Sequence, residues 1–170
     1  MTEQQMLLIA IGIYLVLLAA TTYFTRATLR RFLGALAGGL VVAVVGVGIE
    51  IFFQSLGFWY YPSAADQRYG PKLMYLLVVI MWATLALLGW RVMRRFGWTG
   101  QLLFLTTVTV VGTTRDYLVA GQVLGYIVIT PGLLTVLIDA ACWAGTTALA
   151  QAVMWLVAGD ARDDKLARRP

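Results

Sequence analysis

Long apolar runs, almost free of charged residues, are the feature that most limits what this chain can fold into. Four of them, at residues 6–24, 32–53, 73–90 and 133–158, approach or exceed the ~20 residues that a helix needs to cross a bilayer. Hydrophobic residues make up 61% of the chain and charged residues only 12%, against about 25% charged residues in a soluble domain. Such a chain cannot cover a water-facing surface, so the sequence predicts an all-α, polytopic membrane helical bundle.

A fifth helix is predicted at residues 102–120, although its apolar run is interrupted. Its first 13 residues are apolar but too few to cross the hydrocarbon alone, and they lead into Arg115 and Asp116. We therefore expect one helix that carries this charged pair inside the membrane. The chain would then form a single transmembrane domain of about five helices, followed by a tail at residues 159–170.

Basic residues set the predicted orientation. Ten of the 13 lysines and arginines fall on one side of a five-helix chain, between the first two helices, between the third and fourth, and in the tail. Only Arg68 and Lys72 fall on the other side. Because cytoplasmic loops are enriched in Lys and Arg, we expect the N-terminus outside and the C-terminus in the cytoplasm. The expected location is a plasma membrane, namely the bacterial inner membrane. The net charge of +5 is then explained by basic residues that flank the helices and set their orientation. No nucleic-acid partner is expected.

The residue inventory excludes several kinds of site. The sequence has no histidine and a single cysteine, Cys142. A His-ligated haem, a Ser-His-Asp triad, an HExxH zinc site and an intrachain disulfide are therefore excluded. No metal site and no cofactor are predicted.

Four ionisable side chains fall inside the predicted helices, namely Glu50, Arg115, Asp116 and Asp139. Each costs free energy in a bilayer unless it is paired or hydrated, which makes each one a functional hypothesis. The predicted topology places all four in the outer half of the membrane. In one interpretation Arg115 pairs with Glu50 or Asp139 as a structural clasp. In the other the acids are catalytic, because one base cannot neutralise three carboxylates, and an unpaired one favours its protonated, proton-donating form.

Aromatic residues accompany these acids. Glu50 is followed by the run Gly57-Phe58-Trp59-Tyr60-Tyr61, and Trp82 lies too deep in its helix for an aromatic belt at the lipid headgroups. Since aromatic faces stabilise cations, acids that face aromatic rings in a dry cavity meet the needs of carbocation chemistry. The predicted catalytic residues are Glu50, Asp116 and Asp139, and the predicted substrate-binding residues are Trp59, Tyr60, Tyr61, Trp82, Arg115 and Tyr117.

The segment around Glu50 resembles part of a known enzyme family. Glu50 late in a helix, followed by Gly57-Phe58-Trp59-Tyr60-Tyr61, is similar to the Glu…Gly…Tyr-x-Tyr segment of the carotenoid hydratases. Glu50 with Asp139 in the last helix resembles the layout of the integral-membrane terpene cyclases. In those families such acids protonate an alkene or epoxide, so the resemblance implies an isoprenoid substrate.

Three functions are consistent with these observations. The first is an enzyme of the membrane terpene cyclase, hydratase or isomerase kind, which takes a lipid-soluble small molecule from the membrane lipid. We expect Asp139→Asn and Glu50→Gln to abolish its activity while leaving its stability nearly intact. The second is a non-catalytic subunit of a homo-oligomer or a larger membrane complex, in which Gly34 and Gly38 would admit another helix unless they serve packing within the chain. The third is a proton-coupled transporter with Arg115, Asp116 and Asp139 as its relay.

Overall fold

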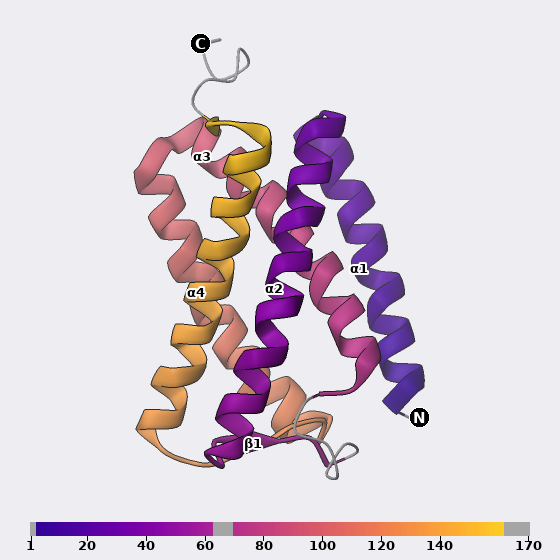
Figure 1. Cartoon of the computed structure of the whole chain (residues 1–170), viewed down its shortest axis with the longest axis vertical. Helices are drawn as coiled ribbons and strands as arrows, with labels where there is room; N and C mark the ends of the chain where they lie inside the picture. The colour runs from indigo at the N-terminus through magenta and orange to yellow at the C-terminus, as the bar shows by residue number, and fades with distance from the viewer. Residues whose placement is uncertain (1–2, 63–69, 162–170) are drawn as a thin grey trace.

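The prediction of an all-α bundle is confirmed by the computed structural model, which describes residues 3–62 and 70–161 (Figure 1). Its long helices are α1 (Glu3–Thr25), α2 (Leu29–Ser55), α3 (Lys72–Arg115) and α4 (Leu133–Ala158). A π-helix, η2 (Asp116–Val123), continues α3, and two short strands, β1 (Trp59–Tyr60) and β2 (Val128–Ile129), pair antiparallel. Within the described residues, four helical segments are long and apolar enough to cross a membrane, α3 and η2 together forming one of them. Most of the predicted tail lies outside the described residues.

Gly97 divides α3 into two arms. Its φ of 62° and ψ of −151° interrupt the helix, and a positive φ of this kind favours glycine, which has no Cβ. With η2 the segment Lys72–Val123 has 52 residues, which is about 78 Å of helix and far more than one bilayer crossing needs. Figure 1 shows the first arm rising beside α1 and the second descending beside α4. The two helices predicted at residues 73–90 and 102–120 are therefore arms of one element that reverses direction at Gly97.

Glycines let α2 approach α4 closely. A Cβ added to Gly34 would lie 3.3 Å from Cβ of Val157, and one added to Gly38 would lie 2.6 Å from the carbonyl oxygen of Ala150. Cβ atoms are not found so close to a backbone oxygen, so α4 can sit at this distance only because residue 38 has no side chain. These two glycines therefore serve packing within the chain.

We expect Gly38→Ala to lower the free energy of unfolding by about 1–3 kcal/mol, because the added methyl group forces α2 away from α4. The control is Gly48→Ala on the same helix, where an added Cβ meets nothing within 4 Å. Thermal unfolding of both variants in one detergent measures the difference. Equal midpoints for the two variants would contradict the close approach of α2 and α4.

Candidate active site

A cavity of about 220 Å³ lies among α1, α2, α3 and α4, and residues of β1, η2 and β2 complete its wall. Most of its wall is apolar, with side chains such as Leu7, Val42 and Met81. Its charged residues are the four predicted membrane charges, all of which line it, namely Glu50, Arg115, Asp116 and Asp139. The fold thus gathers ionisable residues from three distant stretches of sequence in one largely apolar cavity.

β1 and the residue after it fix the carboxylate of Glu50. Because neighbouring residues of a strand point to opposite faces, Trp59 and Tyr61 are buried while Tyr60 is 50% exposed. Trp59 Nε1 donates to Glu50 Oε2 at 2.8 Å, and the Tyr61 hydroxyl donates to Glu50 Oε1 at 2.9 Å. Gln54 Nε2 adds a third donor at 3.3 Å. Both oxygens of Glu50 therefore accept hydrogen bonds from described side chains.

Pairing between β1 and β2 holds this arrangement in place. Trp59 is opposite Ile129 in the antiparallel register. One residue further, the Thr130 backbone N–H donates to the Phe58 carbonyl at 2.9 Å, and the Thr130 hydroxyl donates to the Gly57 carbonyl at 2.6 Å. The loop after α2 is thereby tied to the segment that follows η2, at the end of the cavity.

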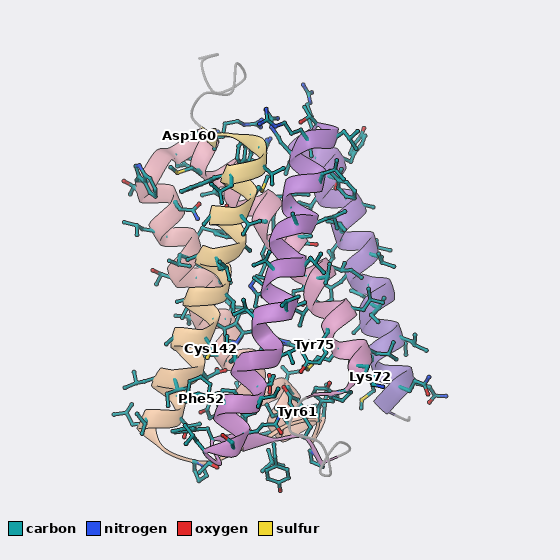
Figure 2. All side chains as sticks on the ribbon, in the orientation of Figure 1. Phe52, Tyr61, Lys72, Tyr75, Cys142 and Asp160 are labelled. Carbon is teal, nitrogen blue, oxygen red and sulfur yellow. The ribbon has the colours of Figure 1, made fainter. Side chains whose placement is uncertain are left out.

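Tyr61 is the tyrosine of this loop that faces inward. Figure 2 shows it at the same end of the bundle as Tyr75, and its ring contacts that of Tyr126 edge-on, with centroids 5.4 Å apart. Burial and the adjacent Glu50 carboxylate raise the pKa of Tyr61 well above its usual value of 10.0. The phenol therefore stays protonated and remains a donor to Glu50 at any physiological pH.

Asp116 has different partners. Its Oδ1 is 2.9 Å from Arg115 Nη1, and its Oδ2 accepts a hydrogen bond of 2.8 Å from Trp143 Nε1. The ion pair of Arg115 is thus with its sequence neighbour, and not with Glu50 or Asp139 as the structural clasp would require. The link from η2 to α4 is instead the hydrogen bond from the Trp143 indole.

Two contacts that could not be predicted from the sequence fix the position of Trp143. Its indole stacks on that of Trp82, with ring centroids 5.0 Å apart and an interplanar angle of 19°. The ring also occupies the space that a Cβ of Gly112 would fill. A glycine on α3 therefore lets the indole pack closely against the helix, with its N–H directed at Asp116.

Gly112→Ala is expected to displace the Trp143 ring, weaken its hydrogen bond to Asp116 and separate it from Trp82. The overpacking should cost about 1–3 kcal/mol of unfolding free energy. Near-UV circular dichroism, which reports coupling between stacked indoles, should lose intensity. Gly145→Ala on α4 is the control, because an added Cβ there has open space. An unchanged spectrum in Gly112→Ala would contradict the stacked arrangement.

Asp139 has the fewest hydrogen-bond partners of the three acids. It is buried, with 9% of its surface exposed. The Thr113 side chain interacts with its carboxyl group, but Oδ2 accepts no hydrogen bond of ordinary geometry from the residues that the structure describes. It lines the same cavity as the other two carboxylates. Since buried polar atoms are almost always satisfied, such an oxygen needs an explanation, and a group that binds in the cavity would supply one.

The other predicted residues divide into two groups. Trp59, Tyr61 and Trp82 line the cavity, whereas Tyr60 and Tyr117 are not part of its wall. Trp143 lines it but was not among the predicted binding residues. Its position four residues after Asp139 places both on one helix face, a signal that could have found it.

Electrostatic and chemical properties limit what the site can hold. No cluster of three or more His, Cys, Asp or Glu side chains within residues 3–62 and 70–161 is placed to bind a metal ion. Carboxyl groups, indoles and one guanidinium in an apolar wall suit proton transfer to an apolar molecule better than binding of a large polar one. No protein-family model, no curated protein and no solved structure matches this chain.

Proposed function

We propose that this protein is an integral-membrane enzyme that acts on an isoprenoid or another lipid-soluble substrate by acid-initiated, carbocation-type cyclisation, hydration or isomerisation. The observation that carries the proposal is the cavity itself. Three carboxyl groups and the stacked indoles of Trp82 and Trp143 meet there within a largely apolar wall. Proton donors, cation-stabilising rings and the exclusion of water are what this chemistry needs.

The different bonding of the acids gives them different roles. Both oxygens of Glu50 and both of Asp116 already accept hydrogen bonds or an ion pair. Asp139 Oδ2 accepts none from the described residues. We therefore assign Asp139 as the proton donor, and Glu50 and Asp116 as the groups that stabilise positive charge and receive a proton.

The reaction begins when the Asp139 carboxyl proton adds to an alkene carbon or an epoxide oxygen. The electron pair of the alkene forms the new C–H bond, or the C–O bond opens, and a carbon atom becomes cationic. The stacked indoles of Trp82 and Trp143 line the cavity where this charge forms, and the Trp143 N–H bond to Asp116 makes that ring more electron-rich. Loss of a proton to a carboxylate gives an alkene, or capture of water gives an alcohol, and the released proton restores Asp139.

For the membrane we propose five crossings, the two arms of α3 counting separately, with the N-terminus outside a plasma membrane such as a bacterial inner membrane. The end of the bundle opposite the cavity is basic and anchored. Arg30 Nε donates to the Val157 carbonyl at 2.6 Å, and the Arg31 guanidinium lies 5.7 Å from the Trp90 ring centroid. By the positive-inside rule this end faces the cytoplasm, which places the cavity in the outer half of the membrane. Arg68 and the basic residues of the tail lie outside the described residues.

Turnover in deuterated water tests the proposal. The purified protein is reconstituted in liposomes and supplied with geranylgeraniol, squalene, 2,3-oxidosqualene or lycopene. We expect one of them to give a product with deuterium on the atom that received the proton, detected by mass spectrometry. A product without deuterium would contradict acid initiation. Failure to convert any of them, together with proton flux across the liposome membrane, would favour the transporter.

A further inference from the structure

A second hollow lies on the outer surface of the bundle, between α2 and α4. It measures about 320 Å³ and is lined by apolar side chains such as Phe53, Ile138 and Leu149. Gly145 on α4 also lines it, and an added Cβ there would meet nothing within 4 Å. In the proposed membrane placement this groove faces the acyl chains of the lipid.

Only a thin wall separates the groove from the cavity. Ile49 of α2 and Cys142 and Thr146 of α4 line both spaces, and Figure 2 shows Cys142 on α4. The Thr146 hydroxyl donates to the Cys142 carbonyl at 2.6 Å, so it is satisfied by its own helix and adds no unmet polar group to the wall. Cys142 lies one helical turn after Asp139. The groove therefore reaches α4 within one helical turn of the residue assigned as the proton donor.

The size of the cavity indicates why a second space is needed. At about 220 Å³, it falls below the ~300–1,000 Å³ typical of sites for drug-sized ligands. A long isoprenoid chain does not fit in it entirely. The adjoining groove is apolar, and in the proposed placement it opens to the phase in which such a molecule is dissolved.

We propose that the groove between α2 and α4 holds the apolar tail of a long polyprenyl substrate whose reactive end lies in the cavity beside Asp139. This inference rests on the proposed function and names its substrate class. The tail crosses the wall formed by Ile49, Cys142 and Thr146, side chains small or flexible enough to move aside. The groove thus selects for chain length, while the cavity selects for the group that accepts the proton.

Binding of a short and a long polyprenol separates the two spaces. We expect geraniol to bind within the cavity alone and geranylgeraniol to extend into the groove. Gly145→Phe fills the groove from a position that does not line the cavity. We expect it to weaken geranylgeraniol binding about tenfold or more, because several methylene groups lose their apolar contacts, and to change geraniol binding by less than about twofold. Native mass spectrometry of the full chain in detergent measures both.

Gly48→Phe is the matched control, since residue 48 is exposed on α2 and lines neither space. It should leave both alcohols bound as in the parent protein. Equal weakening of both alcohols by Gly145→Phe, or no weakening of either, would overturn the inference. So would a Gly145→Phe variant that loses only bound phosphatidylglycerol, because the groove would then hold a lipid acyl chain. If the protein gives a deuterated product but Gly145→Phe binds geranylgeraniol unchanged, the enzymatic function stands and the groove is not the site of the tail. If Gly145→Phe selectively weakens geranylgeraniol binding but no turnover is found, the proposed enzymatic function is wrong and the protein has a polyprenol-binding site.

Discussion

Asp139→Asn is expected to abolish turnover, with a loss of about 10²–10⁴-fold or more, while the protein folds and melts as before. Asparagine has nearly the same shape as aspartate but cannot give up a proton as an acid. The substituted oxygen loses no hydrogen bond, because Asp139 Oδ2 has no donor among the described residues. Product formation in liposomes and thermal unfolding in detergent, measured on the same preparation, check the two halves of this prediction.

Asp160→Asn serves as the control for Asp139→Asn. Asp160 lies just after α4, at the end of the bundle opposite Tyr61 (Figure 2), so its loss removes a carboxyl group far from the cavity. This variant should keep full activity. If Asp139→Asn instead fails to fold, a structural role for the carboxyl group explains it better. If it folds and remains active, another residue is the proton donor.

Glu50→Gln is expected to remove both activity and stability. Three donors converge on the Glu50 carboxylate, from Trp59 and Tyr61 at 2.8 and 2.9 Å and from Gln54 at 3.3 Å. An amide has one acceptor oxygen, and its NH₂ group would face one of these donors. A buried donor left without an acceptor costs about 1–3 kcal/mol. The structure thus changes the expectation drawn from sequence, in which this variant kept its stability.

In Glu50→Gln we also expect β1 to detach from the bundle, because Trp59 and Tyr61 lose their acceptor. Limited proteolysis within residues 57–62 should accelerate in Glu50→Gln, and the melting temperature should fall. Tyr61→Phe removes one donor and should show a smaller shift in the same direction. Tyr60→Phe, which alters the exposed neighbour on the strand, should show none. Equal protection of the loop in all three variants would mean that Glu50 does not hold β1.

Sequence alone determined the long helical segments, because a run of about 20 apolar residues favours a helix whose backbone groups are bonded internally. The predicted run at residues 133–158 coincides with α4 (Leu133–Ala158), and the run at residues 32–53 lies within α2 (Leu29–Ser55). Sequence also predicted one depth for Glu50, Asp116 and Asp139, since counting residues along each helix gives an expected depth. The structure brings all three to the wall of one cavity.

Only the tertiary structure decided which groups touch. Depth leaves the rotation of each helix about its axis undetermined, and that rotation depends on contacts such as the Trp143 ring against Gly112. For this reason Asp116 met Trp143 of another helix, and Asp139 Oδ2 was left without a described partner. Strand pairing decided that Tyr61 faces Glu50 and Tyr60 does not, because alternation is fixed by register and not by residue type. The acids themselves are visible in the sequence, whereas their different hydrogen-bond partners come from packing.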